Sequence, residues 1–503
     1  MIAQVLAALL STAATVPPDR GDLGLAYLRF ERAVARASKD PATRRKANMA
    51  FDALTTDFFA GRFDRALARL AQIEGDLSGE PADAGARRER DFLAAHRVEL
   101  EPRLAEAAAT REVRVRALPL ERMGPGGAPT HVVLRQSGRE LAIDAAGLAS
   151  DGCVASIDPP FAPGPVEVAL RMRALGDVAI GRIFLFDGPP DAQRAGLEAR
   201  IKAIAGNDAM DASTVASLEA RLELAFGDFD RSKSADLLAD PVAIARALDG
   251  EVAAAAGGGR PYATAGDIWR VVRVLGIDMP VRQFVPPGDG PFPLLIALHG
   301  AGGDENLFFD GYGGGRLLAA ARERGVAVVC PPTVPFGISP NVLPKFLEAL
   351  ARDVPFDPAR VGLIGHSLGA VTASRLAVLR PESINGAVCI AGYADLPRKV
   401  KSPPRRVYLA ELDPLFALDG MQATIGTAKG RGEDIEVVVV PNEGHTLVVG
   451  EVVDQAIDWL LARPACSSAP TKPTASAPST SPMNTGVPKP TDSEASPSAG
   501  PRK

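Results

Sequence analysis

The pattern of hydrophobic and polar positions changes period several times along the chain. Over residues 21–110, apolar residues recur at helical spacing, as at Phe63, Ala66, Leu67 and Leu70, which predicts a helical region. A plain helical hairpin is favoured there over a tetratricopeptide array, because such repeats need about three copies to bury a core.

Residues 111–188 follow a different pattern, in which short runs alternate apolar and polar positions. Gly-Pro clusters at 124–129 and 159–165 separate these runs and are typical of turns. We therefore expect a small β-sandwich-like region here. Helical spacing returns over residues 189–257. A run of three glycines begins at the end of this stretch and is typical of a linker.

Residues 258–464 alternate strand-like runs of Val, Ile and Leu with helical segments. Near-continuous apolar strands between helices are typical of a mostly parallel sheet covered on both faces. The predicted fold class is therefore α/β in the C-terminal half, preceded by the helical and β-sandwich-like regions. Residues 465–503 are rich in Ser, Thr, Pro and Ala, and we expect them to be disordered because they cannot bury a core.

Composition excludes several classes of protein. The chain has 503 residues, 46% hydrophobic and 23% charged, with a net charge of −5, so nothing favours electrostatic binding to nucleic acid. No apolar run approaches the roughly 20 residues of a membrane span, and we expect no transmembrane segment. The four cysteines and five histidines show no metal-binding spacing, so we expect no metal or cofactor.

Residues 1–20 are compatible with two interpretations. The apolar run Ile2–Leu10, followed by small residues at 11–14, fits the central region and cleavage zone of a signal peptide. No Lys or Arg precedes the run, and an ordinary first helix fits equally well. The sequence therefore leaves both export, to the periplasm or the medium, and a cytoplasmic location open.

The segment Val361–Ala370 carries the clearest chemical signal, a strand, a tight turn and the start of a helix. Its central residues fit G-x-S-x-G, the pattern of a nucleophile elbow, which makes Ser367 the candidate nucleophile. Gly365 and Gly369 flank it, since a side chain at either position would collide with the neighbouring strand and helix. We expect the His366 side chain to point away from the serine hydroxyl and to act as a supporting residue.

A serine nucleophile needs a nearby base, and the base needs an acid to orient it. His445 follows the predicted strand before the last helix and is the candidate base. Asp413 follows another strand and precedes a proline, which favours a loop position, so it is the candidate acid. Glu411, whose direction depends on strand register, and Asp419, which has the pattern of a helix cap, are the alternatives.

The glycine-rich segment Leu298–Glu305 follows a buried strand and is the candidate oxyanion loop. A tetrahedral oxyanion needs backbone donors already in place, and we expect the amides of Ala301 and Leu368, with Gly302 as a further candidate. His299 and Gly300 support this loop. A phosphate-binding loop is a poor alternative, since no G-K-[ST] follows.

Two other loops have partial signals. Asp228–Asp236 places oxygen atoms at alternate positions, as a calcium loop would, but lacks the glycine at the sixth position and has Ala239 at the twelfth. We expect a helix-capping turn instead. Gly311–Gly315 is glycine-rich without a preceding strand, and we expect a mobile loop near the mouth of the pocket.

With these motifs, the region from about Gly266 to Ala462 resembles the α/β-hydrolase fold, and within it the group of feruloyl and acetylxylan esterases and polyhydroxybutyrate depolymerases. The resemblance depends on PLLIALHGAGGDE, DPARVGLIGHSLGA, LDP and GHT. It implies Ser367 as nucleophile, Asp413 as acid, His445 as base, and an oxyanion hole from the Ala301 and Leu368 amides. The chain departs from secreted depolymerases in lacking paired cysteines, which leaves a polymeric substrate in doubt.

The predicted function is hydrolysis of a small-molecule or carbohydrate-linked carboxylic ester through an acyl-enzyme. No large insertion separates Ala391 from Arg405, which suits an open cleft. A serine peptidase of prolyl-oligopeptidase type is one alternative, since it would use the same triad. A binding protein whose N-terminal regions carry the function is the other. The sequence assigns no role to residues 1–256 and does not indicate the oligomeric state.

Overall fold

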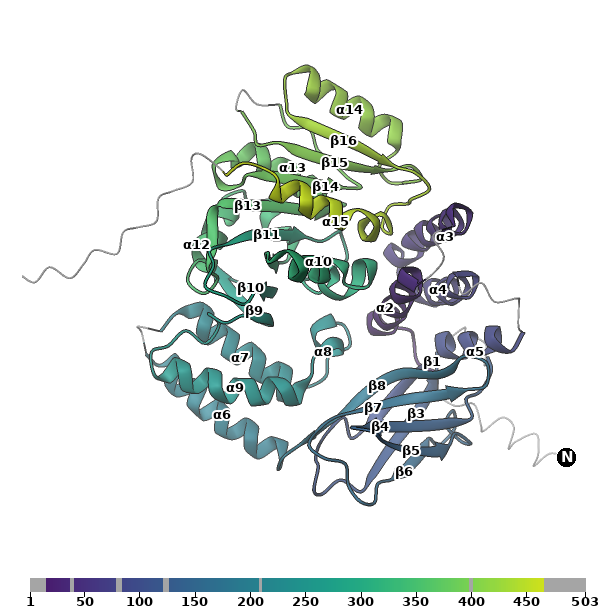
Figure 1. The fold of residues 1–503 in the computed structure, drawn as a ribbon. Coiled ribbons are helices and arrows are strands. Elements are labelled where there is room, and N and C mark those ends of the chain that lie inside the picture. The colour runs from purple at the N-terminus through teal and green to yellow at the C-terminus, as the bar shows by residue number, and fades with distance from the viewer. Residues whose placement is uncertain are drawn as a thin grey trace, which may run out of the picture. The chain divides into compact units, whose positions relative to one another are not determined.

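The structure, a computed structural model, describes residues 15–36, 40–77, 84–120, 126–207, 210–397 and 401–465 (Figure 1). The expected signal segment falls mostly on residues 1–14, and the Ser/Thr/Pro-rich tail almost entirely on residues 466–503. Both expectations therefore lie outside the described residues.

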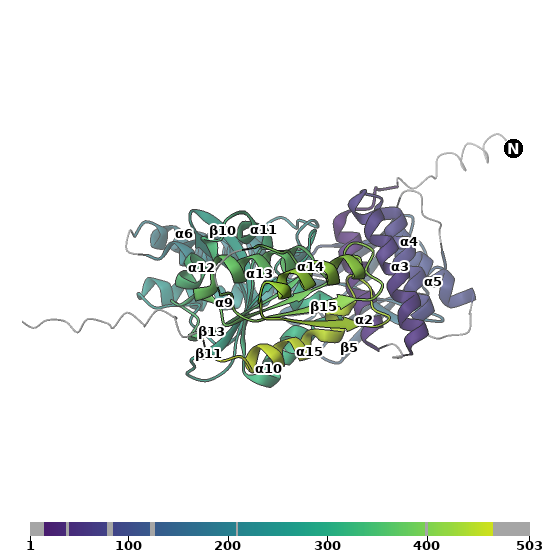
Figure 2. The ribbon, with the colours of Figure 1, turned by 90° about the horizontal axis from the view of Figure 1, so that it is seen from above.

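The N-terminal region is helical up to Ala95, as the sequence pattern predicts, but the prediction of helix as far as residue 110 is wrong, because residues 96–101 and 104–106 form strands. Its helices are α2 (Arg20–Arg36), α3 (Pro41–Phe59), α4 (Phe63–Leu77) and α5 (Ala84–Ala95). Asp40 caps α3 by accepting a hydrogen bond from the Thr43 amide at 2.9 Å. Apolar side chains of α2, α3 and α4, among them Phe30, Phe51 and Leu67, share one buried core. Figure 2 shows these helices side by side.

Two small sheets follow the helices. Their strands are β1 (His96–Glu101), β2 (Leu104–Glu106), β3 (Glu112–Pro119), β4 (His131–Gln136), β5 (Arg139–Asp144), β6 (Cys153–Ser156), β7 (Gly164–Met172) and β8 (Gly176–Phe186). One sheet has the order β1-β3-β6 and the other β2-β8-β7-β4-β5. Alternate residues of both sheets, such as Val113 and Val115 in β3 and Val166 and Val168 in β7, share one core. The prediction of a small β-sandwich-like region is confirmed.

A second group of helices connects the sandwich to the last sheet. It consists of α6 (Pro190–Ala205), α7 (Ala212–Phe226), α8 (Ser234–Leu238) and α9 (Pro241–Ala256). The Ser217 hydroxyl of α7 donates to the Val271 carbonyl at 2.7 Å, which ties this group to the first strand of the large sheet. Before α8, Asp230 accepts hydrogen bonds from the amide and the hydroxyl of Ser232, so this segment is a local turn. The expected helix-capping role is wrong, because the N-cap residue of α8 is Lys233 and its side chain makes no capping hydrogen bond.

The C-terminal half is built on an eight-stranded sheet. Its strands are β9 (Gly266–Val274), β10 (Ile277–Val285), β11 (Phe292–Leu298), β12 (Ala327–Cys330), β13 (Phe356–His366), β14 (Gly386–Ile390), β15 (Arg405–Ala410) and β16 (Ile435–Val440). Their spatial order is β16-β15-β14-β13-β11-β12-β10-β9. Strand β10 pairs antiparallel with β9 and β12, and the remaining pairs are parallel. The predicted α/β class, with a mostly parallel sheet of the α/β-hydrolase type, is confirmed.

Helices cover both faces of this sheet (Figure 1). They are α10 (Arg316–Arg324), α11 (Thr333–Ile338), α12 (Val342–Leu350), α13 (Leu368–Leu379), α14 (Leu418–Gly430) and α15 (Val448–Leu461), with short turns η1 (Leu307–Gly311), η2 (Tyr312–Gly314) and η3 (Pro381–Ser383). In β11, Leu294 and Ile296 pack in one core with Phe346 of α12, whereas Leu295 packs in the other with Val452 of α15. Because both faces are buried, the strand reads as a continuous apolar run.

The glycine-rich segment Gly311–Gly315 differs from its prediction. It forms the end of η1 and the turn η2, and Tyr312 at its centre is only 4% exposed. Gly313, Gly314 and Gly315 all have positive φ, which explains the glycines as a requirement of a tight turn. The segment is a tight turn packed around Tyr312, and the prediction of a mobile loop is wrong.

Candidate active site

The predicted site residues lie in four loops at the carboxyl edge of the large sheet. These loops follow β11, β13, β15 and β16, which are parallel to one another, so their ends meet at one edge. They carry, in order, Ala301, Ser367, Asp413 and His445. Candidate side chains from distant parts of the sequence therefore lie together at this edge.

Ser367 occupies the turn between β13 and α13 with φ 53° and ψ −116°, a strained conformation for a residue other than glycine. The two flanking glycines are required by their surroundings. A Cβ at Gly365 would overlap the Gly369 carbonyl, and a Cβ at Gly369 would overlap the Leu298 carbonyl. The close approach of strand and helix holds the serine at the tip of the turn, as in a nucleophile elbow.

His445 and Asp413 form a buried pair. The Nδ1 atom of His445 lies 2.9 Å from Oδ2 of Asp413, and the residues are 4% and 6% exposed. The other carboxylate oxygen of Asp413 accepts hydrogen bonds from the amides of Leu415 and Phe416, at 2.8 and 3.0 Å. These bonds fix the carboxylate, and the ring of Phe416 stacks on that of His445 with centroids 5.8 Å apart. The imidazole is thus held in one orientation.

The two alternative acids have other partners. Glu411 accepts a hydrogen bond from the Asn442 amide at 2.7 Å and lies 3.8 Å from Arg45. Asp419 is exposed in the first turn of α14, whose N-cap position belongs to Ala417, so the predicted capping role of Asp419 is wrong by two residues. The structure pairs Asp413 with the histidine.

The His366 side chain takes part in a buried hydrogen-bond chain. Its Nε2 atom donates to the His445 carbonyl at 2.9 Å, and its Nδ1 atom accepts from the Tyr312 hydroxyl at 2.6 Å. That hydroxyl in turn accepts from the Gly300 amide at 3.4 Å. Burial, together with the neighbouring His445, lowers the pKa of His366 to about 3, so the ring is neutral at neutral pH. Tyr312 and the neutral His366 ring together connect the candidate oxyanion loop to the loop that carries His445.

The candidate oxyanion loop turns sharply after β11. His299 anchors it, since its Nδ1 atom bonds to the Gly300 carbonyl at 2.8 Å and its Nε2 atom accepts from the Thr333 amide at 3.3 Å. Gly302 has φ 80°, and its carbonyl accepts a hydrogen bond from the Arg20 guanidinium of α2. The amides of Ala301 and Leu368 have no hydrogen-bond partner among the residues that the structure describes. Both are free to donate to a bound oxygen.

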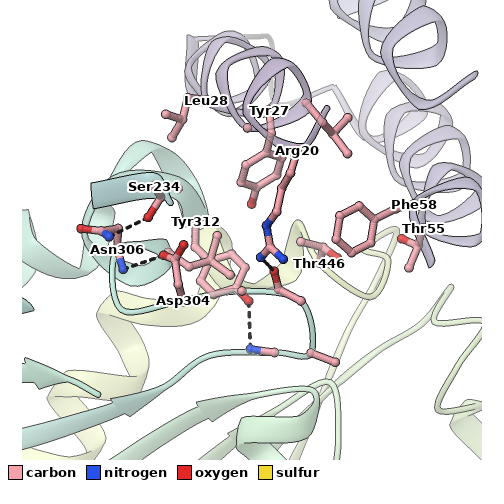
Figure 3. Close-up of a pocket in the computed structure, with 18 of the residues that line it drawn as sticks. Arg20, Tyr27, Leu28, Thr55, Phe58, Ser234, Asp304, Asn306, Tyr312 and Thr446 are labelled. Carbon is pink, nitrogen blue, oxygen red and sulfur yellow. Dashed lines mark hydrogen bonds between the residues drawn. The ribbon is translucent and has the colours of Figure 1, made fainter. Parts of the chain in front are cut away.

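Ser367, His445 and the oxyanion loop line one cavity of about 320 Å³. The opposite wall belongs to the N-terminal helices (Figure 3). Tyr27 and Leu28 of α2 and Thr55 and Phe58 of α3 face the loop that carries Gly300–Gly303. This cavity is therefore bounded by helices that precede the sheet by more than 200 residues, and the open cleft expected from the sequence is wrong in this respect.

Sequence reasoning missed Tyr312, Arg20 and the residues of α3 that face the site. Tyr312 stands beside glycines that drew attention only as a loop signal. In α3, Arg44, Asn48 and Asp52 follow one another at four-residue spacing, and all are buried. A buried polar row on a helix is the signal that could have indicated an interior partner.

No group of three or more His, Cys, Asp or Glu side chains in the described part of the chain is placed to hold a metal ion. Likewise, none of the described helices is long and apolar enough to cross a membrane.

No protein-family model matches the chain. A stretch of 118 residues is 29% identical to RutD of Enterobacter cloacae subsp. cloacae, whose name describes it as a carbamate hydrolase. The match covers 22% of this chain and 41% of the relative, so the chain spans less than half the length of the curated relative that it matches.

Similar solved structures include three hydrolases. S-formylglutathione hydrolase FrmB of Staphylococcus aureus is 14% identical, with a TM-score of 0.35 over 39% of this chain and 96% of that one. A thermostable esterase is 21% identical, with a TM-score of 0.34 over 39% and 63% of the two chains. A feruloyl esterase module of Clostridium thermocellum is 14% identical, with a TM-score of 0.30 over 38% and 89%.

Proposed function

We propose that this protein is a serine hydrolase that cleaves carboxylic esters through an acyl-enzyme. One observation carries the proposal. Ser367, on a positive-φ elbow, opens onto the same cavity as His445, whose Nδ1 atom is held 2.9 Å from Asp413. A nucleophile, a base and an orienting acid are the three parts that such a reaction needs.

The hydrogen bond to Asp413 assigns the protons of His445. With the Nδ1 proton donated to the carboxylate, Nε2 is left as the acceptor for the Ser367 proton. Ser367 then attacks the ester carbonyl, and the imidazolium returns its proton to the leaving alcohol. Water activated by the same Nε2 atom hydrolyses the acyl-enzyme, which restores the serine.

The tetrahedral intermediates carry negative charge on the former carbonyl oxygen. The unpartnered amides of Ala301 and Leu368 are the proposed donors to that oxygen, with Gly302 as a further candidate. His299 and Gly300 hold the first amide in place through the turn after β11, and Gly365, His366 and Gly369 hold the second. Preformed donors stabilise the transition state because they need no reorganisation during the reaction.

The cavity favours small esters over peptides. At about 320 Å³, with a wall made by α2 and α3, it accommodates a small molecule and leaves little room for an extended chain. A peptidase of prolyl-oligopeptidase type is the second candidate because it would use the same three residues. No metal or cofactor takes part in the proposed reaction.

The test is hydrolysis of p-nitrophenyl acetate and butyrate by wild type, Ser367→Ala and, as a matched control, Ser150→Ala. Ser150 is exposed in the β region, and its hydroxyl donates to the Gly147 carbonyl within its own turn. We expect Ser367→Ala to lose several orders of magnitude in rate and the control to keep it. A folded Ser367→Ala protein with wild-type turnover would overturn the proposal. Parallel assays with a carbamate and a peptide p-nitroanilide separate esters from other carbonyl substrates.

A further inference from the structure

The cavity that holds Ser367 is walled mainly by apolar side chains. They come from three separate segments: Leu23, Tyr27 and Leu28 of α2, Leu54 and Phe58 of α3, and Leu237 of α8. Figure 3 shows Tyr27, Leu28 and Phe58 on the side of the cavity opposite the oxyanion loop. A hydrocarbon group bound there would lose most of its contact with water.

Phe58 brings this wall close to the reacting centre. A Cβ added to Gly302 would lie 2.7 Å from the Phe58 ring, so the ring packs directly against the oxyanion loop. An ester whose carbonyl oxygen reaches the Ala301 amide lies next to Gly302, the residue against which this ring packs. The apolar wall is thus part of the reaction site and not a remote pocket.

We propose, on the basis of the function proposed above, that the substrate carries a bulky apolar group next to the scissile bond, either a medium-length aliphatic chain or an aryl ring. The N-terminal helices then determine specificity, because they supply most of the apolar wall. Each methylene buried there is worth roughly fourfold in kcat/KM. The group belongs either to the acyl or to the alcohol part of the ester, and the assay distinguishes the two.

The test measures kcat/KM for two ester series. One varies the acyl chain from acetate to decanoate with p-nitrophenol as leaving group, and the other varies the alcohol of acetate esters from ethyl to octyl. We expect an increase of about tenfold or more between the short and medium members of one series. Which series responds identifies the part of the substrate that the wall binds. A flat response in both would overturn the proposal while leaving ester hydrolysis intact, whereas no turnover of any ester would overturn the function itself.

Two variants connect the preference to the wall. Gly24 of α2 lines the cavity, and a Cβ there meets only Leu237 at 3.7 Å, so Gly24→Leu fills the space. We expect Gly24→Leu to lower the ratio of medium-chain to acetate activity at least tenfold. Phe58→Ala enlarges the cavity and shifts the optimum to longer chains. Met49→Ala, on an exposed side of α3, is the control and keeps the wild-type profile. An unchanged profile in both cavity variants would contradict the proposal.

A second observation, independent of the cavity, concerns the histidine loop. Arg44, Asn48 and Asp52 lie on one face of α3 and bond to this loop. Arg44 donates to the Glu443 carboxylate at 2.7 and 2.9 Å. Asn48 donates to the same carboxylate at 3.0 Å and accepts from the Gly444 amide at 2.8 Å.

Asp52 makes the contact nearest to the proposed base. Its Oδ2 atom accepts a hydrogen bond from the His445 backbone amide at 3.1 Å. Asp52, Asn48 and Glu443 are each less than 8% exposed, so these bonds are shielded from water. We infer that Asn48 and Asp52 are positioning residues, which fix the distance between the His445 ring and Ser367.

The test compares Asp52→Ala, Asp52→Asn and Asn48→Ala with the exposed control Lys46→Ala, also on α3. We expect Asp52→Ala to lower kcat by tenfold or more with little change in KM, because substrate contacts are untouched while the base is displaced. Asp52→Asn keeps an oxygen that accepts from the His445 amide and should restore most of kcat. Asn48→Ala provides the same readout if Asp52→Ala does not fold. Unchanged kcat in a folded variant, or a change confined to KM, would overturn the inference.

Discussion

The carboxylate of Asp52 accepts a hydrogen bond from the backbone amide of His445, across 393 residues of sequence. This bond joins the second described helix of the chain to the loop that carries the proposed catalytic base. It makes the helical region part of the proposed active site, a role that no local pattern in either segment indicates.

The ionisation of Asp52 gives a first prediction. Burial, opposed in part by the hydrogen bond and charge of His445, raises the pKa of Asp52 from 3.8 to about 6, with Asp413 and Glu443 adding to the increase. Because the folded state then holds this proton more tightly than the unfolded chain, the free energy of unfolding falls as pH rises from about 4 to about 6. We expect Asp52→Asn to lack this fall in the free energy of unfolding, which is on the order of 3 kcal/mol in wild type.

Urea unfolding of wild type and Asp52→Asn at several pH values between 4 and 7 checks this prediction. The stability of the variant relative to wild type should increase over that interval and then level off. A difference that stays constant with pH would mean that Asp52 titrates at its ordinary value in the folded protein.

Asp413→Asn tests the orientation of the base. An amide in place of the carboxylate can present its NH₂ group to Nδ1 of His445, which favours the wrong tautomer and leaves no acceptor for the serine proton. We expect kcat to fall about 10³- to 10⁴-fold with KM little changed. Glu411→Gln is the matched control, since Glu411 contacts Asn442 and Arg45 instead. A larger loss of kcat in Glu411→Gln than in Asp413→Asn would identify Glu411 as the acid instead.

The ion pair of Arg44 with Glu443 is predicted to contribute strongly to stability. Both side chains are about nine-tenths buried and lie 2.7 Å apart. Arg44→Met leaves the Glu443 carboxylate buried without its main partner, which typically costs about 3–5 kcal/mol. Thermal and urea unfolding measure the loss. Adding Glu443→Gln to Arg44→Met should recover part of it, and the lack of any recovery would show that the two residues are not coupled.

Tyr312→Phe removes the hydroxyl that links the Gly300 amide to His366. The phenylalanine ring fits the same space, but Nδ1 of His366 loses its hydrogen-bond donor and the Gly300 amide loses its acceptor. This loss costs about 1–3 kcal/mol in the free energy of unfolding. We expect lower stability together with a lower kcat, since Gly300 begins the oxyanion loop. Differential scanning calorimetry and ester turnover measure the two effects. Tyr393→Phe, at a buried tyrosine after β14 whose hydroxyl accepts a hydrogen bond from Arg405, controls for loss of a buried hydroxyl.

The sequence by itself determined the elements and the fold class. Period-2 and period-3.6 patterns located the sandwich and the helices, and continuous apolar strands between helices indicated the parallel sheet, because each pattern reflects which faces are buried. The glycines around Ser367 marked the elbow for a similarly local reason, since strand and helix approach too closely there for a side chain.

Only the tertiary structure decided what surrounds the serine. Whether Asp413 or Glu411 reaches His445 depends on how the ends of two neighbouring strands are aligned. The sequence of neither strand determines that alignment by itself. Tyr312 joins the site because a packed turn buries it, and Phe58 because α3 lies over the oxyanion loop. The buried row on α3 has its partners nearly 400 residues later. Burial and hydrogen bonding between distant segments are properties of the folded chain, and so are the shape and the apolar character of its cavity.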